Sequence, residues 1–197
     1  MSTTRILCLH GYHGSAAVLR RQMGPLAARF PSDVELVLVD APTLSSGDFG
    51  WWHDGMRGWE RTRDWITDLF ASQRFDGVFG FSQGAALTGM LAAVRENDSA
   101  PIDFHLAIMV GGFTNTLPQH AHLFGRKLAL PSLHVIGRRD GIVPISDSLA
   151  LADRFADPVI IEHGGGHVIP DDPAITTRIV EFVARHAAVT RSGLAHG

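Results

Sequence analysis

The feature of this sequence that most restricts its fold is a regular alternation of short apolar runs with longer amphipathic segments. The short runs are rich in β-branched and aromatic side chains, and they cover residues 5–10, 34–39, 75–81, 105–110, 133–137 and 158–162. Several are apolar at successive positions, which is typical of strands buried on both faces. Segments with helical spacing of apolar residues lie between them, at 16–29, 59–73, 83–95, 146–155 and 173–190. This alternation predicts an α/β fold with about six mainly parallel strands and helices on both faces.

The chain of 197 residues is expected to form one domain. No break in composition and no internal repeat divides it. It is 45% hydrophobic and only 19% charged, whereas soluble domains average roughly 25% charged. A large part of the chain must therefore pack away from water, which excludes global disorder. We expect a single domain over residues 1–197, with residues 191–197 as a frayed tail.

The charge balance and the cysteine content restrict the partners and the compartment. Seventeen basic and twenty acidic residues give a net charge of -3 without a basic block, so neither nucleic acid nor an anionic membrane is an expected partner. No apolar run approaches the ~20 residues of a membrane span, and Arg5 leads directly into a strand rather than a signal sequence. Cys8 is the only cysteine, which agrees with a reducing compartment. We expect a cytoplasmic protein and leave its oligomeric state open.

Eleven histidines raise the question of a metal site. There is no H-E-x-x-H motif, and a single cysteine rules out the usual structural zinc patterns. The glycine run at 164–166 lacks the lysine and hydroxyl residue of a phosphate-binding P-loop. We therefore expect no metal and no cofactor.

A candidate nucleophile follows the third predicted strand. Residues 80–84 read Gly-Phe-Ser-Gln-Gly and lead into an alanine-rich helix, which is the G-x-S-x-G pattern in the strand-turn-helix context that its mechanism requires. The turn strains the serine backbone, and the flanking glycines avoid collisions with neighbouring elements. The positive end of the following helix dipole points toward the place where an oxyanion would develop. Ser82 is therefore the predicted nucleophile, and a simple helix N-cap is the alternative reading.

Two later strand ends supply a base and an orienting acid, which a serine nucleophile needs. Asp140 lies in a tight turn after the strand at 133–137, and His167 lies in a glycine-rich loop after the strand at 158–162. The chain order Ser82, Asp140, His167 is that of an α/β-hydrolase triad, with each member just past a different strand.

Both assignments have rivals. Asp140 has the alternative of acting only as an Asx-turn residue, and the competing acids Asp147, Asp153 and Asp157 fall within or at the end of the following predicted helix. His163 competes for the role of base. We prefer His167 because the intervening glycines let the chain reach toward Ser82, whereas His163 ends its strand.

An acyl-transfer serine also needs two backbone N–H donors for the oxyanion. One comes from the residue after the nucleophile, here Gln83. The first strand ends in His10-Gly11-Tyr12, and the N–H of Tyr12 is the candidate for the second donor. Gly11 permits a close backbone approach.

Two long irregular stretches, 41–58 and 111–131, are candidates for the substrate-binding walls, because connections of that length are usually functional or mobile. Whether 111–131 is a lid stays open. Together the two stretches hold a group of large apolar residues. The alternative for the tryptophans is core packing, since Trp59 and Trp65 have helical spacing. The predicted acyl wall consists of Trp51, Trp52, Met56 and Phe113, with Phe49, Leu117, Leu123 and Phe124 as further apolar surface.

Five motifs in chain order resemble the family of serine hydrolases within the α/β-hydrolase superfamily, the group that includes the ovarian-cancer-associated protein 2 homologues and thioesterases that release polyketide acyl chains. The resemblance covers nearly the whole chain, and it implies the α/β-hydrolase fold with Ser82 as nucleophile, Asp140 as orienting acid and His167 as base. The motifs are Ile6 to Tyr12, Trp51-Trp52, Gly80 to Ala85, Gly137 to Pro144, and Gly165 to Pro170.

The segment from Ser46 to Gly50 departs from the more basic, proline-containing form of that family, which leaves substrate specificity open. Gly-Phe-Ser-Gln-Gly is also similar to the phospholipase and carboxylesterase group that contains acyl-protein thioesterases.

We therefore expect a serine esterase or thioesterase that cleaves carboxylic esters or thioesters with an apolar acyl group through an acyl-enzyme. The substrate is expected to be a small molecule, either free or bound to an acyl carrier. An acyl-protein-thioesterase or phospholipase-type carboxylesterase is the alternative. An alternative of another class is a non-catalytic, ligand-binding hydrolase fold, which would retain three chemically matched residues at three strand ends without a role for them.

Overall fold

The structure is a computed structural model that describes residues 3–42, 50–97, 101–114 and 123–193. Its centre is a six-stranded sheet in the order β2-β1-β3-β4-β5-β6, and each neighbouring pair is parallel. The predicted α/β architecture is confirmed. The strands are β1 (Thr4–Leu9), β2 (Val34–Val39), β3 (Gly77–Phe81), β4 (Leu106–Val110), β5 (Ser132–Gly137) and β6 (Val159–His163).

The central strands are the ones that the sequence marks most clearly. Every residue of β3, β4 and β5 is buried, as expected for strands covered on both faces. The third strand begins two residues later than predicted because Asp76 is engaged at its entrance. The Asp76 carboxylate accepts the Arg5 N–H at 2.7 Å, and the Asp76 N–H donates to the Arg5 carbonyl at 2.8 Å.

Within the described residues, α-helices follow each strand except β4, with bounds that differ slightly from the predicted ones. The predicted helix at 16–29 is two helices, because the chain turns at Met23 and Pro25 lies in the first turn of the second one. The last helix runs three residues beyond its predicted end, so 191–193 are helical, while 194–197 lie outside the described residues. The helices are α1 (Ala16–Gln22), α2 (Gly24–Ala27), α3 (Trp59–Ser72), α4 (Gln83–Asn97), α5 (Ile145–Ala152) and α6 (Pro173–Gly193), with a 3₁₀ turn, η1, at Asp54–Met56.

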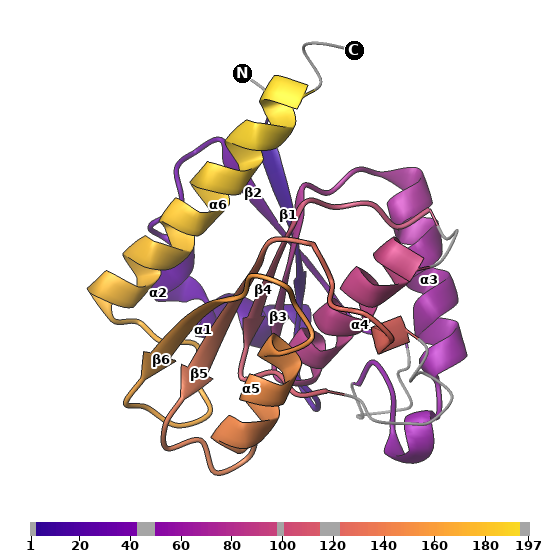
Figure 1. Cartoon of the computed structure of the whole chain (residues 1–197), viewed down its shortest axis with the longest axis horizontal. Coiled ribbons are helices and arrows are strands. Elements are labelled where there is room, and N and C mark those ends of the chain that lie inside the picture. Colours follow the sequence, from indigo (N-terminus) through magenta and orange to yellow (C-terminus); the bar gives the residue numbers. More distant parts are fainter. Residues whose placement is uncertain (1–2, 43–49, 98–100, 115–122, 194–197) are drawn as a thin grey trace.

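The helices form two layers with the sheet between them (Figure 1). Helices α1, α2 and α6 cover one face and α3, α4 and α5 cover the other, and each face has its own apolar cluster. Strand β1 shows how the sequence divides between them: Ile6 and Cys8 point into the first cluster, and Leu7 and Leu9 into the second. This is the two-residue period of a strand.

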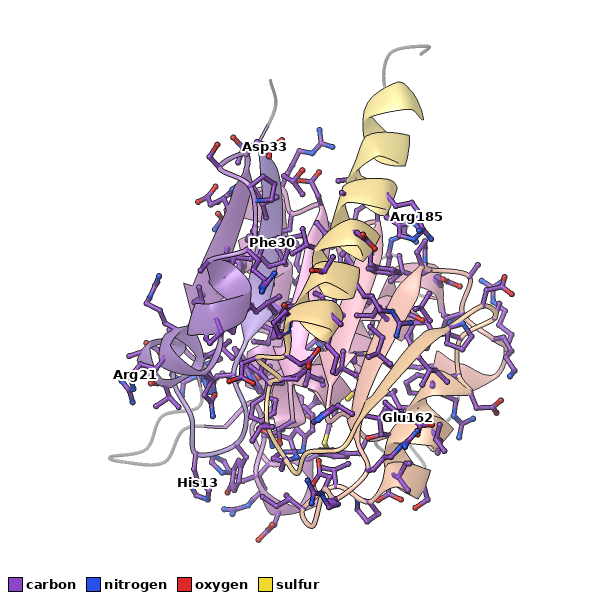
Figure 2. The ribbon with its side chains drawn as sticks, turned by 90° about the vertical axis from the view of Figure 1, so that its left-hand side faces the viewer. His13, Arg21, Phe30, Asp33, Glu162 and Arg185 are labelled. Carbon is purple, nitrogen blue, oxygen red and sulfur yellow. The ribbon has the colours of Figure 1, made fainter. Side chains whose placement is uncertain are left out.

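Because all the strands are parallel, their carboxyl ends meet at a single edge of the sheet, where ligands bind in folds of this kind. Figure 2 looks onto the α6 face, where His13 lies near the lower, carboxyl edge and Asp33 lies at the opposite edge. Helix α6 crosses this face, and Phe30 packs against the same apolar cluster. Within the described ranges, no helix has both the length and the apolar character needed to cross a membrane.

Candidate active site

Ser82 occupies a strained turn between β3 and α4. Its φ of 56° lies in the left-handed region, which a non-glycine residue adopts only where the surroundings enforce it. The Ser82 N–H donates to the Val110 carbonyl at 2.9 Å, and the Ser82 carbonyl accepts the Ala85 N–H at 2.9 Å. The two neighbouring glycines are required sterically, because a Cβ at Gly80 would strike the Gly84 carbonyl and one at Gly84 would strike Leu9. The turn therefore has the geometry of a nucleophile elbow.

Asp140 and His167 lie in direct contact although 27 residues separate them. His167 Nδ1 lies 2.6 Å from Asp140 Oδ2, and the Asp140 side chain is only 2% exposed. The other carboxylate oxygen accepts the N–H groups of Ile142 at 2.9 Å and Val143 at 2.8 Å. Asp140 thus forms the Asx-type turn and holds the histidine at the same time, so the two readings of its role coexist.

These contacts favour the ionised form of Asp140 and one tautomer of the His167 imidazole. Burial acts to raise the pKa of the Asp140 carboxyl, but the hydrogen bonds from the Val143 N–H, from His167 and from the Ile142 N–H outweigh it and hold that pKa below its ordinary value. Because an ionised carboxylate only accepts hydrogen bonds, the proton of a neutral His167 lies on Nδ1. Nε2 is then left with the lone pair that a general base needs.

The imidazole of His167 lies beside the nucleophile turn. Its ring packs on that of Phe81, the residue before Ser82, with centroids 4.9 Å apart. Gly111, after β4, makes room for it: a Cβ there would lie 3.1 Å from His167 Cε1. The described side chains of Ser82 and His167 form no hydrogen bond with each other, and in free enzymes such bonds often tighten only when substrate binds.

The rival residues have other partners. His163 Nδ1 accepts the Gly165 N–H at 3.2 Å, so this histidine supports the glycine loop, and burial lowers its pKa. Asp153 is paired with Lys127 at 2.6 Å, while Asp147 lies in the first turn of α5 and Asp157 is exposed. Among the described residues, Asp140 is the carboxylate bonded to His167.

The two candidate oxyanion donors come from two segments that meet at Ser82, the loop after β1 and the start of α4. A Cβ at Gly11 would lie 3.1 Å from Ser82 Cβ, so the loop that carries Tyr12 reaches the nucleophile. Gln83 is the first residue of α4, where backbone N–H groups have no partner within the helix. Neither the Tyr12 N–H nor the Gln83 N–H donates a hydrogen bond to a described residue. Both are available to a substrate oxygen.

A cavity of about 580 Å³ opens beside Ser82. Trp52, Met56 and Phe113, three of the four predicted wall residues, line it. The fourth, Trp51, does not reach the cavity: it is fully buried, and its indole N–H donates to the His10 carbonyl at 2.7 Å. Phe49 and Leu117 lie outside the described residues, and Leu123 and Phe124 belong to or pack against the core cluster.

Sequence reasoning missed several lining residues. Ile142 and Val143 follow Asp140 directly in the acid loop, and this adjacency was the signal that could have identified them. The hydroxyl of Thr114 is buried without a hydrogen-bond partner, and a polar substrate atom in the cavity would supply one. The other polar lining residues that were missed are His53, Asp54 and Asp147.

The described lining of the cavity is acidic. Asp54 and Asp147 both contribute to it, and the described residues around the cavity include no lysine or arginine. The arginines of the acid loop are engaged elsewhere: Arg138 pairs with Glu162 at 2.8 Å, and Arg139 donates to the Gly164 carbonyl at 2.5 Å. Within the described ranges, no group of three histidine, cysteine, aspartate or glutamate residues is placed to hold a metal ion.

Comparison with known proteins places this chain among serine hydrolases and esterases. The family model described as serine hydrolase (FSH1) matches residues 1–179. The chain is 32% identical over 197 residues to esterase OVCA2 of Xenopus tropicalis, and the alignment covers 84% of this chain and 86% of that protein. It is also 32% identical over 219 residues to esterase OVCA2 of Danio rerio, and this alignment covers 92% of the chain and 96% of the relative.

Crystal structures show the same fold at lower sequence identity. The Bacillus cereus carboxylesterase superposes with a TM-score of 0.69 at 18% identity, and the superposition covers 93% of this chain and 89% of the carboxylesterase chain. The acyl-protein thioesterase 2 of Zea mays superposes with a TM-score of 0.65 at 17% identity, covering 93% of this chain and 95% of the thioesterase chain. The α/β-hydrolase fold expected from the sequence is confirmed.

Proposed function

The chain belongs to the serine hydrolase (FSH1) family, and we propose that it hydrolyses carboxylic esters or thioesters with an apolar acyl group through an acyl-enzyme. One observation carries this proposal: the Asp140–His167 pair, joined at 2.6 Å, lies beside the strained Ser82 and a cavity with apolar walls.

In the proposed reaction the Ser82 hydroxyl attacks the carbonyl carbon while His167 Nε2 takes its proton. The Tyr12 and Gln83 N–H groups bind the oxyanion that forms, and Asp140 stabilises the imidazolium. His167 then returns the proton to the departing alcohol or thiol, which leaves an acyl group on Ser82. A water molecule then loses a proton to His167 and attacks the acyl carbon. The bond between that carbon and Ser82 Oγ breaks, His167 returns the proton to Oγ, and the carboxylic acid leaves.

The acyl group is proposed to lie against the apolar side of the cavity. Trp52, Met56 and Phe113 come from the two irregular stretches, and Val143 comes from the acid loop. Each methylene that these residues cover stabilises the transition state by up to ~0.8 kcal/mol. We therefore expect kcat/KM to rise with chain length until the cavity is full.

The leaving group is proposed to be neutral or cationic. Asp54 and Asp147 lie around the cavity, and its described lining contains no lysine or arginine. Phosphate groups, as in coenzyme A or a phosphopantetheine carrier arm, would be repelled by these carboxylates. A chain attached to a protein through an uncharged thioester is the second candidate substrate, because Ile142 at 72% exposure and Tyr12 at 41% form an apolar rim at the cavity.

The proposal is tested with a fluorophosphonate that labels activated serines. We expect one adduct by intact mass, its loss in Ser82→Ala, and its retention in Ser72→Ala, where an exposed helical serine is removed. The wild-type protein should also cleave the octanoyl thioester of N-acetylcysteamine faster than octanoyl-coenzyme A. Labelling that survives Ser82→Ala would overturn the nucleophile assignment, and a wild type without labelling or turnover would favour the non-catalytic binding fold.

A further inference from the structure

The side chain of Gln83 is held by a segment far away in the sequence. It is only 6% exposed, and both ends of its amide are bonded. Oε1 accepts the Trp51 N–H at 2.9 Å, and Nε2 donates to the Trp52 carbonyl at 2.8 Å. The residue whose N–H is a proposed oxyanion donor is thus fastened to a peptide 31 and 32 residues earlier.

Trp51 continues this connection to the other side of the site. Its indole N–H donates to the His10 carbonyl at 2.7 Å, and its ring packs on the His10 imidazole with centroids 4.8 Å apart. Its own carbonyl accepts the Thr62 hydroxyl at 2.5 Å from α3. Trp51 therefore joins the end of β1, the start of α4 and helix α3 through buried hydrogen bonds.

His10 carries the connection into the loop that bears the second donor. Its Nε2 accepts the Ala41 N–H at 3.1 Å, so the ring proton lies on Nδ1, which donates to the Gly11 carbonyl at 2.8 Å. Tyr12 follows directly. Its ring lies over Gly50, where a Cβ would be 2.6 Å from the phenol carbons.

We propose that Gln83 and Trp51 are positioning residues that together set the separation of the Tyr12 and Gln83 N–H groups. One buried residue, Trp51, is bonded both to the Gln83 side chain and to the carbonyl of His10, two residues before Tyr12. An oxyanion gains from such donors only if they are in place before its charge develops. The inference rests on the acyl transfer proposed above, and it assigns Trp51 a role in the transition state instead of contact with the acyl chain.

Two variants test this role without removing either backbone donor. Gln83→Met keeps the length of the side chain but removes both hydrogen bonds, and Trp51→Phe keeps a ring but removes the indole N–H. Because displacing reacting groups by ~1 Å costs up to about 100-fold, we expect each variant to lower kcat by about 10- to 100-fold and to change KM less than about threefold. Trp65→Phe is the matched control: its ring lies 6.3 Å from that of Trp51 but outside the network, so its kcat should stay near that of the wild type.

A pair of inhibitors separates positioning from general damage to the site. An octyl trifluoromethyl ketone forms an oxyanion on Ser82, whereas octan-1-ol fills the cavity without one. Each variant should bind the ketone more weakly than the wild type does, by the same factor as its loss of kcat/KM. Each variant should bind octan-1-ol with the affinity of the wild type. The kcat of the double variant should be only slightly lower than that of the less active single variant, because both residues act on the same two donors.

The outcomes are decisive in both directions. Unchanged kcat in folded Trp51→Phe and Gln83→Met, or an equal loss of ketone and octanol affinity, would overturn the inference. Thermal unfolding of each variant shows whether it is folded, and Trp51→Phe provides the test if Gln83→Met unfolds at the assay temperature. A wild-type protein that turns over no ester would instead overturn the proposed function, before any variant is compared.

Discussion

The two halves of the candidate active site are built in different ways. The acid-base half, Asp140 and His167, lies on two short loops that follow the neighbouring strands β5 and β6, and a single side-chain contact of 2.6 Å joins it. The proposed oxyanion half consists of the backbone N–H groups of Tyr12 and Gln83. The buried Trp51 is hydrogen-bonded to the Gln83 side chain and to the His10 carbonyl. In the acid-base half the proposed reacting groups are side chains. In the oxyanion half they are backbone N–H groups, so the important side chains are those that hold the backbone in position.

The largest effect is expected from a substitution that disables only the acid-base half. In Asp140→Asn the amide oxygen can still accept hydrogen bonds from the Ile142 and Val143 N–H groups, so the NH₂ group faces His167 Nδ1. The histidine proton is then forced onto Nε2, which can no longer accept the serine proton, and kcat should fall by roughly 10⁴-fold. Esterase assays on p-nitrophenyl octanoate measure this. Asp147→Asn, which alters a carboxylate at the cavity, should stay within about threefold; an equal loss there would remove the special role of Asp140.

The pH profile sharpens the comparison, because the buried His10 beside the oxyanion half should keep its neutral form. Burial lowers the pKa of His10, although its bond to Gly11 and the charge of Asp40 partly oppose this. A histidine with a lowered folded pKa supports the fold above its unfolded pKa of about 6.5, and that support is lost as the pH falls toward the folded value. Asp140, whose pKa is also lowered, stays ionised over the same range.

His10 should therefore add no second proton to the acid limb of log kcat/KM, and the slope of that limb should not exceed one, or about tenfold per pH unit. Assays from pH 8 to pH 5, with the melting temperature recorded at each pH, measure it. A slope of two in a protein that remains folded would show that the oxyanion half titrates as well.

The adjacent tryptophans provide a smaller test, because they belong to different parts of the site. Trp52 lines the cavity and meets Trp59 edge-on at 6.3 Å, so Trp52→Ala should lower kcat/KM for octanoyl esters by about tenfold while acetyl esters change little. Trp51→Phe should lower all chain lengths by the same factor. Profiles from acetyl to decanoyl esters distinguish the two, and a uniform loss in Trp52→Ala would mean that Trp52 is packing rather than an acyl wall.

The smallest effect is expected at the exposed contact of the oxyanion half. The Tyr12 hydroxyl lies 3.2 Å from His53 Nδ1, where water competes for both groups and the net stabilisation is small. Tyr12→Phe should therefore change kcat/KM by less than about threefold in the same assay. A tenfold loss would show that this surface bond positions the Tyr12 N–H as strongly as the buried bonds of Trp51.

Prediction from sequence succeeded where chemistry and pattern are local. The central strands were recognisable because their residues are apolar at successive positions, and the Gly80–Gly84 motif because only glycine fits on either side of Ser82. The break at Met23 within the predicted helix at 16–29 was missed, since amphipathic spacing continues across it. Trp51 and Trp52 were not distinguishable either, because adjacent side chains of one type point in directions that only the fold defines.

The order of strands and helices, the strand-turn-helix context of Ser82, and the residue types at the ends of β5 and β6 were present in the sequence itself, since they depend on periodicity and on side-chain chemistry. The contact of Asp140 with His167, the acidic lining around Asp54 and Asp147, and the bridge from Gln83 through Trp51 to His10 were decided only by tertiary structure. Each joins segments that are distant along the chain, and no local pattern specifies which buried donor meets which carbonyl. Burial makes such pairings obligatory, because an unpaired polar group inside the protein is costly, but the packing of the whole chain selects the partners.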